Sequence, residues 1–277
     1  MKIALTATPS QARFAPIVWR GDIERGFDLA AGLGYDGVEL HLRQPGDIDR
    51  AAARKLSVQS DLGIPTLGTG MAAGEDGLTF SDLRPEVRGQ AVERIKEQIA
   101  LAAYLNSAVT IGLVRGRLGS DSEQHPARLA AILSCLDECC RSAQAREVKI
   151  FLEPLNRYET DYLNTIEQTL DTIEAIGASN LYLLADTFHM NIEEVDMAAA
   201  LRRAGARLGH VHLVDSNRQA PGYGHLDIRS ILQALSGIHY QGYLSFEVLP
   251  LPESRQVARD AISFTRSLLE AVSHEPG

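Results

Sequence analysis

Short apolar segments rich in β-branched residues alternate along the whole chain with longer segments whose apolar residues recur at helical spacing. The short segments are typical of buried strands and the long ones of amphipathic helices. The pattern predicts strands at residues 3–7, 37–41, 65–68, 108–113, 148–153, 181–186, 209–214 and 243–248. The clearest predicted helices are 22–33, 85–105, 126–145, 165–176, 195–204 and 253–271.

The links between these elements indicate the fold class. Alternating strands and helices are typical of an α/β protein in which helical crossovers join parallel strands. Links from helix to strand are short and contain glycine, as in GLGYDG, whereas links from strand to helix are longer and polar, as in VRGRLGSDSEQHP. Long loops at the C-terminal ends of strands are typical of a barrel with its working face there. We therefore expect one (β/α)8 TIM barrel domain over residues 1–277. An open doubly wound sheet is the alternative, although TATPSQARF is not its usual phosphate loop.

Charge and composition narrow the classes of function. The net charge is −9 and charges of both signs are mixed along the chain, which argues against a nucleic-acid partner. The chain contains no apolar run of the roughly 20 residues that span a bilayer, and its first residues are typical of a strand and not of a signal peptide. We expect a cytoplasmic protein with no membrane partner. The odd number of cysteines, without a CxxC pair, predicts free thiols.

The last four predicted strands each end with a residue that can bind a metal. Glu153 ends the fifth strand, Asp186 the sixth, His212 the seventh and Glu247 the eighth. His210 lies on the same face as His212, because side chains of a strand alternate, but it is farther from the C-terminal end, so we expect it to be a buried neighbour. The alternative is that these side chains only cap strands or pair with basic residues. Burial of several carboxylates in one barrel mouth without a partner is costly, which favours a shared cation.

Three carboxylates and one imidazole suit a hard or borderline divalent ion. We expect Mn²⁺, with Mg²⁺ or Co²⁺ as alternatives. Zn²⁺ is less favoured, because its sites usually contain thiolates or several histidines.

Four motifs in the second half of the chain are EPLNRYET, ADTFHMNIEE, HVHLVDSNRQAPGYGHLD and SFEVLPLP. In these motifs the sequence resembles the D-tagatose 3-epimerase and D-allulose (psicose) 3-epimerase family, sugar epimerases with a xylose-isomerase-like barrel. In the first half, GTGMAAGEDGLTF and TIGLVRGR are similar to the branch of 5-keto-L-gluconate epimerases, which act on keto-uronates.

The resemblance implies roles for matching residues. The four strand-end residues would hold one divalent metal, and Glu153 and Glu247 would also be the catalytic acid and base. His189, Arg218 and Glu159 match substrate-binding positions. The family's aromatic pocket near the first strand is not clearly matched, and Phe14 and Trp19 are the candidates for it.

This residue set suits the inversion of a carbon next to a carbonyl. A metal on the substrate oxygens would stabilise the enediolate that forms when the proton leaves. One carboxylate removes the proton from one face and a second returns a proton to the other face. Two opposed glutamates therefore favour an epimerase, since an aldose–ketose isomerase needs a base on one face only.

Two further arginines and one aspartate follow predicted strands. Arg115 and Arg117 follow the fourth strand, and an arginine that reaches the mouth would suit a sugar acid, because its guanidinium binds carboxylates through a planar fork. The alternative is that both face water. Asp227 is expected to cap the next helix.

Other roles stay open for two of the residues that match substrate-binding positions. His189 could be structural, and Arg218 could be a charged residue of a solvent-exposed loop.

Three other functions stay open from the sequence. An aldose–ketose isomerase of the hydroxypyruvate isomerase type would share the barrel and the metal. A metal nuclease of the endonuclease IV type would share the barrel, but it uses more histidines and a basic groove. The third alternative is a sugar-binding barrel without activity. The resemblance also implies a homo-oligomer, a dimer or tetramer.

Overall fold

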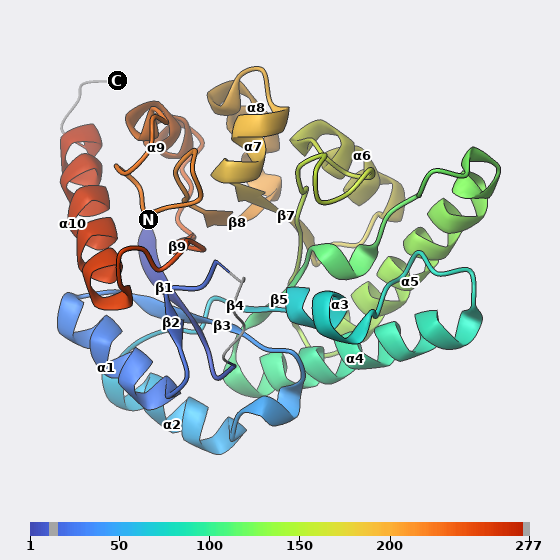
Figure 1. Cartoon of the computed structure of the whole chain (residues 1–277), viewed down its shortest axis with the longest axis horizontal. Coiled ribbons are helices and arrows are strands. Elements are labelled where there is room, and N and C mark those ends of the chain that lie inside the picture. The colour runs from blue at the N-terminus through green and yellow to red at the C-terminus, as the bar shows by residue number, and fades with distance from the viewer. Residues whose placement is uncertain (11–15, 274–277) are drawn as a thin grey trace.

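The computed structural model describes residues 1–10 and 16–273, and in these ranges parallel strands close into a barrel (Figure 1). Each barrel strand pairs with the next in parallel, and the first pairs with the last. The barrel strands are β1 (Lys2–Thr8), β3 (Gly37–His41), β4 (Thr66–Gly68), β5 (Ala108–Ile111), β6 (Ile150–Leu152), β7 (Leu181–Asp186), β8 (Leu208–His212) and β9 (Tyr243–Phe246). The predicted eight strands are confirmed. The short strand β2 (Trp19–Arg20), which pairs with the C-terminal end of β1, was not predicted, because two residues carry no periodic pattern.

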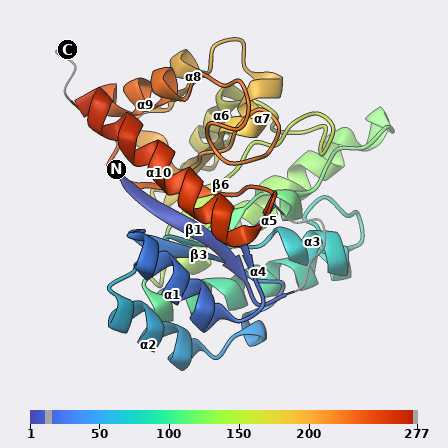
Figure 2. The same cartoon turned by 60° about the vertical axis from the view of Figure 1, so that its left-hand side comes forward.

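Helices follow the strands and surround the barrel (Figure 1). They are α1 (Ile23–Leu33), α2 (Arg50–Ser60), α3 (Gly70–Asp76), α4 (Pro85–Leu105), α5 (His125–Gln144), α6 (Ile166–Ile176), α7 (Thr187–Glu193), α8 (Met197–Ala204), α9 (Ile228–Gly237) and α10 (Ser254–Ser273). Short 3₁₀ turns occur at Pro45–Asp47, Leu113–Arg115, Ser122–Gln124 and Gly205–Arg207. The last helix, α10, packs against α1 and α9, so the end of the described chain closes the ring of helices (Figure 2).

Capping residues set the ends of several helices. The side chain of Asp22 accepts a hydrogen bond from the backbone N–H of Arg25 and begins α1, and Asp227 caps α9 as predicted. Gly34 ends α1 in the left-handed conformation, which glycine adopts at low cost.

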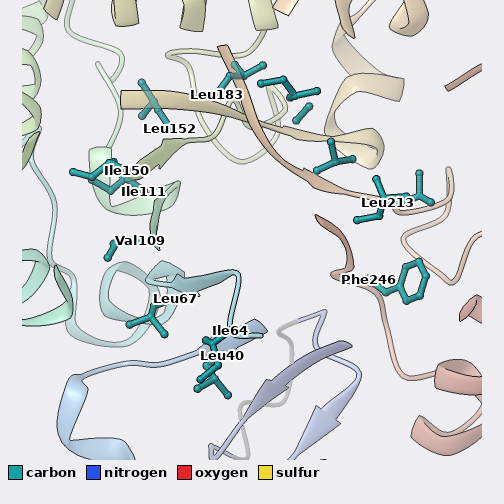
Figure 3. Packing of buried hydrophobic residues seen from close by; sticks show 14 of the residues in the cluster. Leu40, Ile64, Leu67, Val109, Ile111, Ile150, Leu152, Leu183, Leu213 and Phe246 are labelled. Atoms are coloured by element: carbon teal, nitrogen blue, oxygen red, sulfur yellow. The ribbon is translucent and has the colours of Figure 1, made fainter. Parts of the chain in front are cut away.

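Alternation along the strands divides the buried residues into two sets. Leu40, Val109, Ile111, Leu152 and other residues of the large cluster pack between the barrel and its helices (Figure 3). A separate small apolar cluster of Ala108, Phe151 and Leu184 lies on the other face of the sheet, inside the barrel. Several polar residues are also buried on this inner face: Thr6, Glu39, Thr66, Thr110, His210 and Ser245. In the described part of the chain, no helix is both long enough and apolar enough to cross a membrane.

Candidate metal centre and active site

The four strand-end residues predicted as metal ligands lie together. Glu153 follows β6, Asp186 ends β7, His212 ends β8 and Glu247 follows β9. Each offers one ligand atom, and these atoms all lie within 4.8 Å of one another. Asp186 and His212 are at most 1% exposed, so the cluster lies at the inner end of the barrel mouth.

The imidazole of His212 is the centre of the cluster. Its Nδ1 lies 3.4 Å from Glu153 Oε1, 3.6 Å from Asp186 Oδ2 and 3.8 Å from Glu247 Oε2. These separations are too long for hydrogen bonds, and His212 Nδ1, Glu153 Oε1 and Asp186 Oδ2 are buried without a hydrogen-bond partner. Buried polar atoms rarely stay unpaired. Three carboxylates and one ring nitrogen that converge in this way fit a divalent cation.

A register shift brings two of these residues side by side. In the pairing of β7 with β8, Leu208 lies opposite Leu183, but His210 lies opposite Leu184, so Gly209 is an extra residue. The shift places His212 opposite Asp186, and residues in register on parallel strands point to the same side. A Cβ atom at position 209 would lie 2.5 Å from the ring of Phe151, so the extra residue has to be glycine.

Glycine also makes room for the ligand carboxylate on β6. A Cβ atom on Gly112 would lie 2.6 Å from Oε2 of Glu153. The absence of a side chain there lets the Glu153 carboxylate lie against the backbone that follows β5.

Burial and charge oppose each other in the pKa values of this cluster. Burial acts to raise the pKa of Asp186, but the nearby charges of His189 and His212 lower this pKa below its usual range. Burial raises the pKa of Glu247, despite the neighbouring charges of His212 and Arg218. The carboxylates in the mouth therefore differ in their affinity for protons.

The predicted substrate-binding residues form a second layer around the cluster. Arg218 donates from Nη1 to Glu159 at 3.1 Å and from Nη2 to Glu247 at 2.9 Å, and its guanidinium lies 4.7 Å from the centre of the Phe188 ring. His189 Nδ1 lies 2.7 Å from the side-chain amide nitrogen of Asn156, and the Nε2 atom of His189 is buried without a partner.

His189 lies on helix α7, which follows β7 directly. The carboxylate of Asp186 accepts hydrogen bonds from the backbone N–H groups of Phe188 and His189, which begins the helix directly after β7. One side chain therefore both starts the helix and belongs to the metal cluster.

A cavity of about 620 Å³ lies over this cluster. Its wall includes the predicted residues Glu153, Glu159, His189, His212, Arg218 and Glu247. A larger hollow of about 1090 Å³ lies at the opposite end of the barrel, around Lys2 and Tyr243, and the four-residue cluster does not line it. The cavity at the C-terminal ends is the better candidate for a substrate site, because the convergent unpaired groups are there.

Both expectations for Arg115, that it reaches the substrate or that it faces water, were wrong. Its side chain is fully buried and donates from Nη1 to the carbonyl of Gly112 and from Nη2 to the carbonyls of Tyr162 and Leu163. It does not line the cavity. Burial lowers the pKa of Arg115 to about 10, so it stays charged at neutral pH. It ties two loops together. Arg117 is exposed, as the alternative expected, and donates to the carbonyl of Glu159.

The aromatic candidates have different outcomes. Trp19 lies on β2, donates from its indole N–H to the carbonyl of Asp22 and does not line the cavity. Phe14 lies outside the described residues. The apolar wall of the cavity comes instead from residues such as Met71, Leu113 and Phe188.

Two buried polar residues of β3 were missed at the sequence level. Glu39 and His41 lie two residues apart on the same face of this strand. Glu39 is within hydrogen-bonding distance of both His41 and His212. The signal was a charged residue inside an apolar segment, GVELH, two residues before a histidine on the same face.

Comparison with known proteins agrees with this geometry. Residues 27–268 match the family model described as xylose isomerase-like TIM barrel. The chain is 33% identical to the L-ribulose 3-epimerase of Mesorhizobium japonicum over 230 residues, which is 82% of this chain and 76% of that protein. It is also 33% identical to the D-psicose 3-epimerase of Enterocloster bolteae over 236 residues, 81% of this chain and 76% of that protein. A solved structure of an L-ribulose 3-epimerase superposes with a TM-score of 0.85 at 27% identity and covers 99% of both chains.

Proposed function

This chain belongs to the xylose isomerase-like TIM barrels and is a carbohydrate epimerase of the ketose 3-epimerase kind. From this we propose that it inverts the carbon next to the carbonyl of a ketose, through an enediolate. The observation that carries the proposal is the convergence of Glu153, Asp186 and Glu247 on the unpaired Nδ1 of His212. A bound divalent ion, which we propose to be Mn²⁺ with Mg²⁺ or Co²⁺ as alternatives, would polarise the carbonyl and a neighbouring hydroxyl.

Glu153 and Glu247 are the proposed acid and base. In the ring of strands, β7 and β8 lie between the strands that carry them, so the two carboxylates approach the cavity from different directions. One removes the proton from one face of the substrate and the other returns a proton to the opposite face. Arg218 orients the carboxylate of Glu247 by donating a hydrogen bond to its Oε2.

His189 and Glu159 are proposed to bind substrate hydroxyls. The Nε2 of His189 is buried without a partner and the residue lines the cavity, so it can contact a substrate oxygen. Arg218 donates a hydrogen bond to Glu159 in the cavity wall. Either side chain can give up this bond and form one with a substrate hydroxyl group instead.

A neutral ketose suits this wall better than a keto-uronate. Among the described residues that line the cavity, four are glutamates and Arg218 is the single arginine or lysine. Its guanidinium already pairs with Glu159 and Glu247. A substrate carboxylate would therefore add negative charge without a free cationic partner.

The test is incubation of the Mn²⁺-loaded protein with D-fructose, L-ribulose and a keto-uronate in deuterated water, followed by NMR. We expect one epimer of a neutral ketose with deuterium at the inverted carbon. Formation of an aldose alone would instead favour the isomerase alternative, and turnover of the keto-uronate alone would contradict the proposed substrate class.

A further inference from the structure

A fully buried carboxylate lies beneath the candidate metal centre. Glu39, in the middle of β3, is 0% exposed and does not line the cavity. Its Oε1 lies 2.9 Å from Nε2 of His41 and 3.0 Å from Nε2 of His212, and its Oε2 lies 2.8 Å from Nε2 of His210. Three imidazoles from two strands thus meet on one carboxyl group.

The contacts of Glu39 indicate its role in hydrogen bonding. Three ring nitrogens lie 2.8–3.0 Å from its two oxygens, an arrangement that suits an ionised carboxylate. An ionised carboxylate can only accept hydrogen bonds. Each of the three Nε2 atoms that contact it must therefore carry a hydrogen.

The two nitrogens of His212 consequently have different roles. Nε2 contacts Glu39 at hydrogen-bonding distance, 3.0 Å, whereas Nδ1 lies 3.4–3.8 Å from three carboxylate oxygens. Direct contacts around Glu39 leave no room for an ion there, although Glu39, His210 and His212 also lie close enough together to be considered as a metal group. The space for an ion is on the Nδ1 side.

From these contacts we propose that Glu39 is a positioning residue: its carboxylate holds the proton of His212 on Nε2, so that Nδ1 presents its lone pair to a metal shared with Glu153, Asp186 and Glu247. Ligating histidines commonly donate their second N–H to an acceptor that fixes the orientation of the ring. Glu39 does not reach the cavity, so it acts through His212 and not on the substrate. The inference rests on the proposed function only for the metal site.

The test compares metal affinity in the full chain. We expect Glu39→Gln to raise the Kd for Mn²⁺ by about 10–100-fold, measured by titration calorimetry, because one amide oxygen cannot accept from three N–H groups. Glu39→Leu, which removes both acceptors, should weaken binding further. If the leucine variant does not fold, the glutamine variant alone carries the comparison.

His210→Gln is the matched control. His210 contacts the same carboxylate and is equally buried, but it is not one of the four residues of the candidate metal site. Its replacement should leave the Kd for Mn²⁺ near the wild-type value. An equal loss of affinity in this control would show a general packing effect and overturn the inference.

Nitrogen NMR of the Mg²⁺-loaded protein gives a readout that packing alone does not move. We expect the His212 ring of the wild type to carry its hydrogen on Nε2, and the Glu39→Gln protein to show a mixture of tautomers. An unchanged tautomer and an unchanged Kd would overturn the role of Glu39. A wild-type protein that binds Mn²⁺ but forms no epimer would contradict the proposed function and leave this comparison valid.

Discussion

At the scale of single residues, the site depends on which atoms lack a partner. His212 Nδ1 and the facing oxygens of Glu153 and Asp186 are buried acceptors without donors, and they face one another. Burial without a partner costs free energy, so these atoms mark the position that a cation would stabilise.

Replacement of Glu247 tests the acid–base pair. We expect Glu247→Gln to lower kcat by at least about a hundredfold, because an amide can neither accept nor return the substrate proton. The measurement is the rate of ketose epimerisation at saturating Mn²⁺. Glu86→Gln, the same exchange in the first turn of α4, is the control and should retain the wild-type rate. A sugar-binding barrel without activity would lose nothing in either variant.

Gly112 tests the space that Glu153 occupies. A methyl group at this position would lie 2.6 Å from Glu153 Oε2, so Gly112→Ala must displace the carboxylate. We expect about a hundredfold loss of kcat/KM, the usual cost of a misplaced catalytic group. Gly46→Ala, where nothing lies within 4 Å of the added atom, should be neutral. Equal rates for both variants would contradict the proposed place of Glu153.

The cysteines of α5 give a prediction on pH. Burial raises the pKa of Cys140 to about 12 and that of Cys139 well above its usual value. Both thiols therefore stay protonated in the folded protein at pH 8 and should resist an aromatic disulfide reagent until the protein is unfolded, when all three cysteines react. The same shift is stabilising below about pH 8.5, the ordinary thiol pKa, and this stability is lost as pH rises towards 12. Fast labelling of Cys139 in the folded state would contradict this.

At the scale of elements, the ends of strands and helices position the site. Asp186 ends β7 and caps α7, and the extra residue in β8 brings His212 into register with it. Arg115 ties the turn after β5 to the loop that carries Glu159 by donating only to backbone carbonyls. The helix cap by Asp186 and the hydrogen bonds of Arg115 make these segments rigid, because they satisfy backbone groups that would otherwise be unpaired.

Helix α1 offers a matched pair of substitutions for stability. Gly32 is helical and has open space around it, so Gly32→Ala should raise the free energy of unfolding by about 0.5–1 kcal/mol. Gly34 ends the same helix at φ +79°, so Gly34→Ala should lower it by about 1–2 kcal/mol. Urea unfolding measures both, and a rise in stability for the second variant would contradict the left-handed end of α1.

At the scale of the whole molecule, closure of the barrel brings the site together. The pairing of β9 with β1 completes the ring, and residues from four successive strands then point to one mouth. Binding of a metal to this mouth requires the folded chain, so metal affinity and stability are linked.

Metal addition should therefore raise the melting temperature. At a Mn²⁺ concentration one hundred times the Kd, mass action stabilises the fold by about 2.7 kcal/mol, and a chelator should reverse the shift. Differential scanning fluorimetry measures it. Asp186→Asn, which removes one charged ligand, should abolish most of the shift, and an equal shift in that variant would contradict the four-residue site.

Much of the fold and of the site was predictable from local patterns. The strand at 37–41 and the helix at 85–105 have the predicted bounds, because alternation and the Pro85 start are local signals. The convergence of Glu153, Asp186, His212 and Glu247 was predictable because each ends a strand predicted from the sequence. The helix after β7 was missed, since its cap depends on a side chain already assigned to the metal. Homo-oligomer formation and a cytoplasmic location stay predictions.

The sequence by itself determined the order of strands and helices, the family and the four convergent strand ends, since these follow from periodicity and from motifs that each lie within a short segment. Only the tertiary structure decided the contact of Glu39 with His212, 173 residues apart, and the burial of Arg115 among backbone carbonyls. The reason is that a side chain's partner across the barrel is set by strand register and closure, which no local pattern encodes.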